Sequence, residues 1–267
     1  MVKEWGKHPI TEDAMLRTVM LMVLLFPMCE AGDGLPFRKD LAGDRALPLP
    51  FGISIDYYTM DQPYRVDSLG LSLPNFQVDP SLIGVENEIQ YLDIKFDVWI
   101  LPFLNAFAIV GQLDGETDVD FAPLQLPLPL GKVQVDYDGF TYGAGLVFAI
   151  GGDQWFGSLT TTFTDSNLSG DFDSSVSAFT AQPKLGWSFE FVDVWAGAMY
   201  LSADEEHKGT IDIQPLGPVG FEVSLSEDQS WNGNAGLQFK FSPSWQLIVE
   251  AGFGDRDTLL ANIGYRF

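Results

Sequence analysis

The feature that most constrains the fold of this 267-residue chain is a strict alternation of apolar and charged side chains. It is clearest in residues 88–100, where Leu92, Ile94, Phe96 and Val98 alternate with Asp93, Lys95, Asp97 and Trp99. Successive side chains of a β-strand project from opposite faces, so one face of this segment requires an apolar environment and the other requires water. The chain also lacks the run of about 18 apolar residues that a membrane-spanning helix requires. Any crossing of a membrane must therefore be made by strands that satisfy one another's backbone groups.

The C-terminus repeats this pattern and ends on an aromatic residue. Apolar residues occupy every second position: Leu259, Ala261, Ile263, Tyr265 and Phe267. The opposite face carries Asn262 and Arg266. This segment resembles the closing strand of bacterial outer-membrane β-barrels, which the barrel-assembly machinery recognises. The resemblance implies that Ile263, Tyr265 and Phe267 form the assembly signal and that this machinery is a partner. It also implies that the protein resides in the bacterial outer membrane.

Ten segments show the same alternation. They are residues 51–60, 88–100, 105–116, 135–150, 155–164, 176–190, 194–201, 230–241, 245–253 and 259–267. Short turns and long loops alternate between them, as in outer-membrane barrels. The sequence therefore predicts an all-β fold, a transmembrane antiparallel up-and-down β-barrel of ten strands over residues 49–267, with eight or twelve strands as alternatives. A soluble ten-stranded sandwich is a further alternative, because alternation alone does not distinguish a face in lipid from a face in a packed core.

Both ends of such a barrel lie on the periplasmic side. The long extracellular loops are then predicted near residues 61–87, 117–134, 165–175 and 202–229. Five tryptophans fall near the short turns and predict an aromatic belt where the outer membrane meets the periplasm. They are Trp99, Trp155, Trp187, Trp195 and Trp245.

The N-terminus reads as a secretory signal. Residues 19–26 are apolar, they follow Arg17, and Cys29 and Ala31 supply small residues for cleavage. We expect residues 1–31 to be the signal peptide, with residues 1–14 an upstream extension if Met15 is the initiator. Residues 32–48 are then a polar periplasmic lead-in. Cleavage after Ala31 removes the only cysteine, so the mature chain needs no disulfide.

The net charge of −23 argues against nucleic acid as a partner. The expected partners are outer-membrane lipid and lipopolysaccharide, whose phosphates are bridged by divalent ions, and the chain is expected to be a monomer. The segment 114–120 is rich in carboxylates but lacks the bidentate glutamate spacing of an EF-hand. We therefore expect neither a structural metal site nor a cofactor.

Charged residues also fall on the face predicted to line the lumen. They are Asp56, Asp93, Lys95, Asp97, Glu116, Lys184, Glu190, Lys240, Glu250 and Arg266. Buried charges require partners, so a narrow lumen of this kind should hold a charge network rather than an open channel. This pattern predicts a barrel that binds or transports a small apolar or cationic ligand through a narrow pore. A structural or adhesive surface barrel without transport is the alternative.

Three of the predicted outer loops carry apolar, proline-containing tips. The residues expected to cap the mouth or to bind a partner there are Leu124, Leu126, Leu128, Leu216 and Val219. The flanking residues predict hairpins that extend beyond the membrane, with Val119 opposite Val133, and Ile211 and Ile213 opposite Phe221 and Val223.

The chain contains two histidines, which limits the enzyme mechanisms that it could support. A phospholipase of the Ser/His type would need a histidine on a strand, and none of the predicted strands has one. Asp118 and Asp120, with Glu205 and His207, resemble the acid and acid-His pairs of the omptin proteases, where histidine deprotonates an attacking water. Omptins have aspartate where Glu205 stands. The chain is therefore not expected to be an enzyme, with an omptin-like endopeptidase as the alternative.

Overall fold

The computed structural model describes residues 34–43, 46–71, 79–122, 132–170, 172–213 and 217–267. The chain divides into Met1–Leu35 and Pro36–Phe267, and all strands belong to the second unit. The described strands are β1 Phe51–Leu71, β2 Gly84–Leu101, β3 Leu104–Asp120, β4 Lys132–Gly151, β5 Trp155–Gly170, β6 Phe172–Ser188, β7 Val192–Ile213, β8 Gly217–Glu227, β9 Trp231–Lys240, β10 Trp245–Phe253 and β11 Asp257–Arg266. Two short 3₁₀ turns, η2 Lys39–Ala42 and η3 Pro80–Leu82, accompany them. None of the helices in these ranges is long and apolar enough to cross a membrane.

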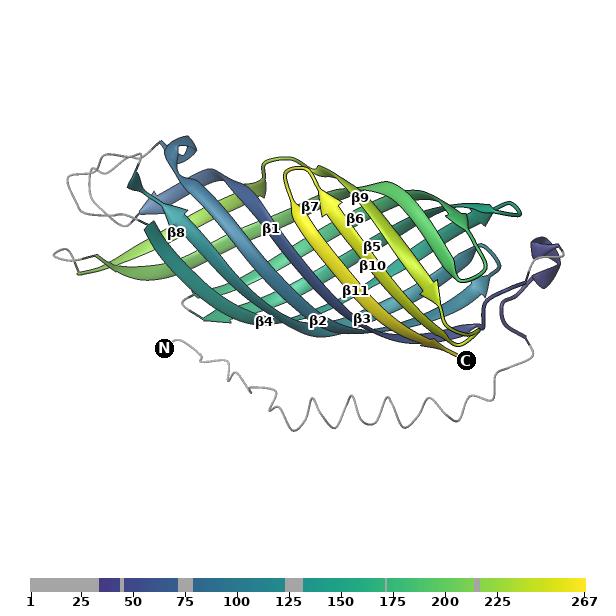
Figure 1. The fold of residues 1–267 in the computed structure, drawn as a ribbon. Coiled ribbons are helices and arrows are strands. Elements are labelled where there is room, and N and C mark those ends of the chain that lie inside the picture. The colour runs from purple at the N-terminus through teal and green to yellow at the C-terminus, as the bar shows by residue number, and fades with distance from the viewer. Residues whose placement is uncertain (1–33, 44–45, 72–78, 123–131, 171, 214–216) are drawn as a thin grey trace, which may run out of the picture. The chain divides into compact units, whose positions relative to one another are not determined.

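Ten of the strands form a closed antiparallel ring, β1 to β7 followed by β9, β10 and β11 (Figure 1). The ring is closed by β1 and β11, which pair from Gly52 with Arg266 to Asp61 with Asp257. The end of the barrel that carries Phe51 and Phe267 is called the periplasmic end below, following the predicted orientation, and the opposite end is called the outer end. At the periplasmic end of this seam the backbones of Phe51 and Phe267 exchange hydrogen bonds of 3.1 and 3.0 Å, and their rings stack. The predicted ten-stranded barrel is therefore confirmed.

The lead-in lies at the same end of the barrel. The backbone N–H of Phe37 donates to the carbonyl of Ile100 at 2.8 Å, and Arg38 forms an exposed ion pair with Asp40. The predicted signal peptide, residues 1–31, lies outside the described residues and stays a prediction.

The outer surface of the ring is apolar. Ile55, Leu92, Phe163 and Leu185 project from four different strands and are each more than half exposed. Such exposure is unfavourable in water but suits a hydrocarbon environment.

Tryptophans mark the periplasmic edge of this band. Trp155, Trp187 and Trp245 project outward there, as the sequence predicts. Trp99 and Trp195 do not belong to the belt. Trp99 lies on the same face of β2 as Asp97 and its indole nitrogen is buried, and the Trp195 ring is buried. The indole N–H of Trp195 finds a carboxylate inside the barrel, which explains why this ring is stable away from the membrane interface.

Several strands continue beyond the apolar band as hairpins. Val119 pairs with Val133 between β3 and β4, as the sequence predicts. In the β7–β8 hairpin Ile211 pairs with Val219 and Ile213 with Gly217, so the predicted pairing with Phe221 and Val223 has the wrong register. The tips that carry Leu124, Leu126, Leu128 and Leu216 lie outside the described residues.

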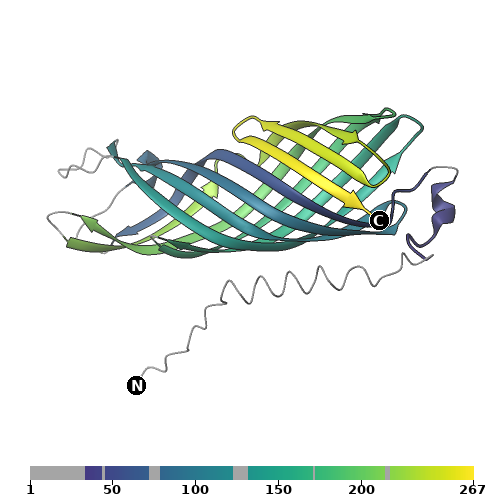
Figure 2. The ribbon, with the colours of Figure 1, turned by 60° about the horizontal axis from the view of Figure 1, so that its bottom comes forward.

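Strand β8 gives the barrel two different cross-sections. On one side it pairs with the outer part of β7, and on the other with residues 64–71 of β1 (Figure 2). At this level β8 completes a ring with β1 to β7, whereas the ring in the membrane contains β9, β10 and β11 instead. The barrel therefore narrows from ten strands to eight toward the outside. The diameter of a barrel grows with strand number, and an eight-stranded interior is just filled by side chains.

The packing follows this change in strand number. The eight-stranded part contains a hydrophobic core of Tyr64, Val66, Ile83, Val85 and Leu225, all buried. We call these five residues the outer core. Leu69, Val119, Phe121 and Val223 pack against it. The ten-stranded part, in contrast, encloses a cavity.

Arg256 links the β10–β11 turn to the segment between β8 and β9, where the barrel changes from ten strands to eight. It lies in the turn between β10 and β11, is 2% exposed, and donates to the carbonyls of Gln229 and Ser230 at 2.9 and 3.0 Å. Asn232 bonds both the N–H and the carbonyl of Arg256. These contacts satisfy backbone groups at the break between β8 and β9, where ladder partners are missing. Burial lowers the pKa of the Arg256 guanidinium.

Much of the negative charge lies outside the barrel, in one row. Asp257, Asp61, Glu88, Glu116 and Asp136 are direct cross-strand neighbours on β11, β1, β2, β3 and β4, and all five are exposed. Glu116 therefore does not line the lumen, contrary to the prediction, because the inward face of β3 carries Gly115 and Thr117. Like charges directly opposite each other in a sheet are destabilising.

This row leads to a stability prediction. The double substitution Glu88→Gln and Glu116→Gln should raise the free energy of unfolding at low salt by about 1 kcal/mol or less, because it removes three like-charge contacts. Urea titrations at 10 mM and 1 M NaCl measure the effect, which should vanish at high salt, where the screening length is about 3 Å. Glu190→Gln is the matched control, since Glu190 is exposed in a turn away from the row. A gain that persists at 1 M NaCl would contradict the electrostatic explanation.

Candidate functional site

The interior of the ten-stranded ring holds a cavity of about 1380 Å³. It begins at the periplasmic turns, near residues 151–153 and 242–244, where residues 46–49 of the lead-in also line it. The outermost described residues that line it are Tyr64, Asn87, Thr117 and Leu225, so it ends directly below the outer core.

The outer half of this cavity is apolar. Met60, Ile89 and Leu201 form a buried cluster against which Tyr58, Tyr91, Tyr137 and Ala178 pack. Leu113, Leu168 and Met199 are also buried here. Tyr58 and Tyr91 face each other across β1 and β2, with ring centroids 6.1 Å apart. A flexible methionine and several tyrosines form a surface that can adapt to an apolar molecule.

The inner half is charged, and Glu250 on β10 is the centre of its largest network. Glu250 is only 6% exposed. Its carboxylate accepts a hydrogen bond from the ammonium group of Lys184 of β6 at 2.5 Å and another from the indole of Trp195 of β7 at 2.7 Å. Asn234 of β9 donates to its second oxygen at 3.4 Å. The Lys184 ammonium also lies 5.4 Å from the centre of the Trp195 ring. One buried anion therefore connects four neighbouring strands.

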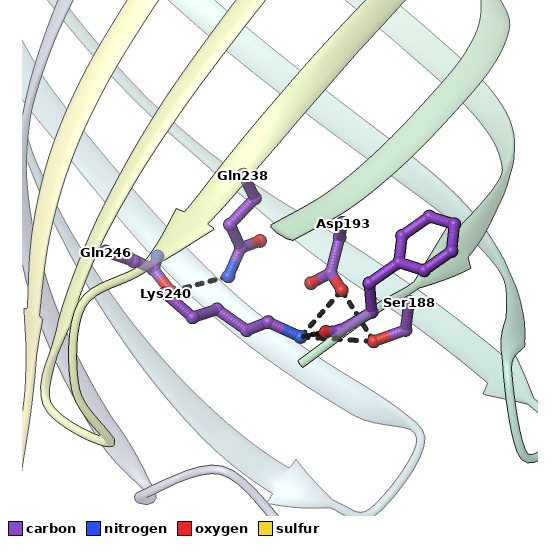
Figure 3. Close-up of polar contacts among 6 residues, drawn as sticks. Ser188, Asp193, Gln238, Lys240 and Gln246 are labelled. Atoms are coloured by element: carbon purple, nitrogen blue, oxygen red, sulfur yellow. Dashed lines mark hydrogen bonds and ion pairs between the residues drawn. The ribbon is translucent and has the colours of Figure 1, made fainter. Parts of the chain in front are cut away.

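Lys240 is the centre of a second network at the periplasmic edge (Figure 3). Its ammonium donates to Asp193 at 2.8 Å, to Ser188 at 3.2 Å and to the carbonyl of Phe189 at 2.6 Å. Beside it Gln238 donates to Gln246 at 3.1 Å.

The predicted lumen residue Glu190 does not take part in this network. It is exposed in the turn that follows β6, because that strand ends at Ser188. Asp193, near the start of β7, is the carboxylate that faces Lys240.

The last two ion pairs hold the seam of the barrel. Lys95 of β2 lies 2.7 Å from Asp56 of β1, and Arg266 of β11 lies 2.8 Å from Asp97 of β2. Asp56 also accepts from Ser54 at 3.0 Å and from Asn262 of β11. Asp97 accepts from Asn105 of β3 at 2.6 Å, and Arg266 reaches the carbonyl of Leu49 at 3.0 Å. These contacts tie the first strands to the last.

The four ion pairs leave the inner half of the lumen nearly neutral. Of the strand carboxylates that line the cavity, Asp56, Asp97, Asp193 and Glu250 each pair with a cation, and Asp93 does not. The lumen charges therefore pair in networks, as expected for a narrow barrel.

The omptin-like residues lie on two different hairpins. Asp118 and Asp120 end β3, where they pair with Gln134 and Lys132 of β4. Glu205 and His207 lie in β7, paired with Leu225 and Val223 of β8. Three strands separate β3 from β7 in either direction around the eight-stranded ring, so the two pairs face each other across it. The omptin-like site stays a prediction.

Sequence reasoning missed several polar residues of the lumen. Asn105, Asp193 and Asn234 each bond a charged partner. The available signal in the ninth strand was the pair Asn232 and Asn234, two positions apart, since an amide on the inner face of a strand needs a partner. Asn262, which the sequence places on the polar face of the last strand, donates to Asp56. Val219, the remaining predicted loop residue, lies in β8.

A closed antiparallel ring with an apolar outer band, a tryptophan belt and a polar inner lumen defines an outer-membrane β-barrel protein. Its place is the bacterial outer membrane. No protein-family model matches the sequence, and no curated protein sequence matches it.

Solved structures with a similar fold include three from different bacteria. The translocator domain of the autotransporter NalP from Neisseria meningitidis is 12% identical, with a TM-score of 0.39, over 96% of this chain and 98% of that one. The outer membrane protease OmpT from Escherichia coli is 9% identical, with a TM-score of 0.46, over 82% and 97%. The outer membrane protein OprG from Pseudomonas aeruginosa is 9% identical, with a TM-score of 0.44, over 83% and 99%. At these values none of the three bears on what this chain does.

Proposed function

We propose that this barrel binds a small, mainly apolar molecule inside its lumen and serves in the transport of that molecule. The observation that carries the proposal is the 1380 Å³ cavity, whose outer half is lined by buried methionine, leucine, isoleucine and tyrosine side chains. Protein sites for small molecules have this character, with predominantly apolar walls and a few placed polar groups.

The arrangement of the two halves supports exchange of the ligand at the periplasmic end. The outer core lies in the eight-stranded part above the cavity, where an interior of eight strands is just wide enough for side chains to fill, whereas the cavity itself reaches the periplasmic turns. The ion pairs line the wall near this opening and satisfy one another, so an apolar molecule can pass them without leaving a charge unpaired.

A cavity-filling substitution tests the proposal. Ala178 lies on the inner face of β6 and lines the apolar half, whereas Ala181 on the same strand faces outward, where it pairs with Thr161 and Tyr200. Ala178→Trp should weaken the binding of 1-naphthalenemethanol about tenfold, since overpacking a filled site costs about 1–3 kcal/mol. Ala181→Trp should leave it unchanged.

Isothermal titration with the barrel in lipid nanodiscs measures both variants, and protein-free nanodiscs correct for partition into lipid. Heat-dependent migration in gels shows that both variants are folded. Equal affinity of the two variants, or no saturable binding to the wild type by this alcohol, would overturn the proposal.

A further inference from the structure

Asp93 on β2 stands apart from the other charged residues of the cavity. Its neighbour across β1 is Asp56, whose charge is already matched by Lys95 at 2.7 Å. The Oδ1 atom of Asp93 is buried and accepts no hydrogen bond from the described residues. Two carboxylates thus lie directly opposite each other in the sheet, and the ion pair of Lys95 with Asp56 balances one of them; such a pair of like charges is unfavourable unless a second positive group approaches.

A second unpaired acceptor lies in the same row. Asn262 of β11 pairs with Asp56 on its other side, so Asn262, Asp56 and Asp93 are in register across three strands. Asn262 is 1% exposed, and its Oδ1 also lacks a donor among the described residues. Both orphan atoms are acceptors, so each lacks a hydrogen-bond donor, and of the two residues Asp93 is the one that lines the cavity.

The position of Asp93 indicates what kind of molecule would supply the donor. One step outward on the same inner face are Tyr91 and Tyr58, the tyrosine pair at the base of the apolar half. On the other side Asp93 packs against Gly111 of β3, where an added Cβ would lie 2.4 Å from the Asp93 Cβ. The Asp93 carboxylate therefore lies at the boundary between charged and apolar walls, and close packing against β3 holds it there.

We propose that Asp93 binds the ammonium group of an amphipathic amine, a molecule with an apolar body and one positively charged nitrogen. This inference rests on the proposed function, because the apolar body occupies the tyrosine-lined half of the same cavity. The ammonium supplies donors to Asp93 and balances the carboxylate pair. The faces of Tyr58 and Tyr91 attract the same cation.

The test compares three probes of one shape: 1-naphthylmethylamine, the neutral 1-naphthalenemethanol and the anionic 1-naphthoate. The wild type in lipid nanodiscs should bind the amine about tenfold or more tightly than the alcohol, as expected for a hydrogen bond to a charged group, and should bind the anion most weakly. Asp93→Asn should abolish the preference for the amine and leave the affinity for the alcohol unchanged. Asp153→Asn, which removes the same charge from an exposed turn at the cavity mouth, should keep the preference.

Each outcome separates the two proposals. If amine and alcohol bind equally to the wild type, or if Asp153→Asn reduces the preference as much as Asp93→Asn, a specific site at Asp93 is refuted while the apolar cavity stands. If none of the three probes binds saturably, the proposed function itself fails. Asp93→Glu serves as the second variant, since it keeps the charge and should retain part of the preference, provided that it folds.

Discussion

Replacing Glu250 by alanine is expected to lower the free energy of unfolding by about 3–5 kcal/mol. The substitution removes the carboxylate that Lys184, Trp195 and Asn234 share. Lys184, whose side chain is 15% exposed, is then left as an uncompensated charge inside the barrel. The loss is measured by urea unfolding from phospholipid vesicles, followed by tryptophan fluorescence.

Two further variants separate the charge from the lost packing. Glu250→Leu combined with Lys184→Met removes both charges and keeps side-chain volume, so it should recover most of the stability. Glu190→Ala is the matched control, because this glutamate is exposed in a turn and should change stability by less than about 0.5 kcal/mol. A cost for Glu250→Ala as small as that for Glu190→Ala would show that the network does not stabilise the barrel.

The second large effect concerns conductance. The wild type should show no steady current in planar lipid bilayers, because the outer core lies in the eight-stranded part of the barrel, and an interior of eight strands is just wide enough for side chains to fill. Tyr64→Ala combined with Leu225→Ala removes two of its five side chains and should open a measurable conductance. Both residues lie directly above the cavity, so the space that they vacate connects with it.

The control for this experiment is Ile89→Ala. Ile89 is also buried but lines the cavity below the outer core, so its truncation enlarges the cavity without opening the outer end. A wild-type current equal to that of the double variant would show that the outer core is not the barrier. A large current through Ile89→Ala would place the barrier at the level of that residue.

Alternation was sufficient to predict the ring. In residues 92–98 the apolar side chains project outward and the charged ones inward, and the same rule orients the two faces of the last strand, which pairs with β1. The reason is physical, because each membrane strand has one face in hydrocarbon and the other in a polar interior.

Pairing between distant loops was not predictable in this way. Strand β8 pairs with the outer part of β1, about 150 residues away, and no periodicity within either segment encodes that contact. The only local sign is Pro63, which lacks an N–H and lies where β1 changes its neighbour from β11 to β8.

Small errors in strand boundaries explain the misplaced residues. Extending the sixth strand by two residues placed Glu190 in the lumen, whereas β6 ends at Ser188 and the turn exposes Glu190. The position of a tryptophan near a turn likewise does not determine whether its side chain faces the lipid or the lumen. The indole of Trp195 bonds the buried Glu250 carboxylate instead of facing lipid. Which cation meets which anion depends on strands that are far apart in sequence, as with Lys184 and Glu250.

Because β1 is long enough to have two successive neighbours, the barrel is sealed twice, by different parts of the chain. Its membrane part is sealed by β11 and its outer part by β8, which precedes β9, β10 and β11 in the chain. A chain that lacks β9, β10 and β11 would thus retain every strand of the external ring yet leave a three-strand gap facing the lipid. The outer ring therefore closes without the three strands on which closure of the membrane ring depends.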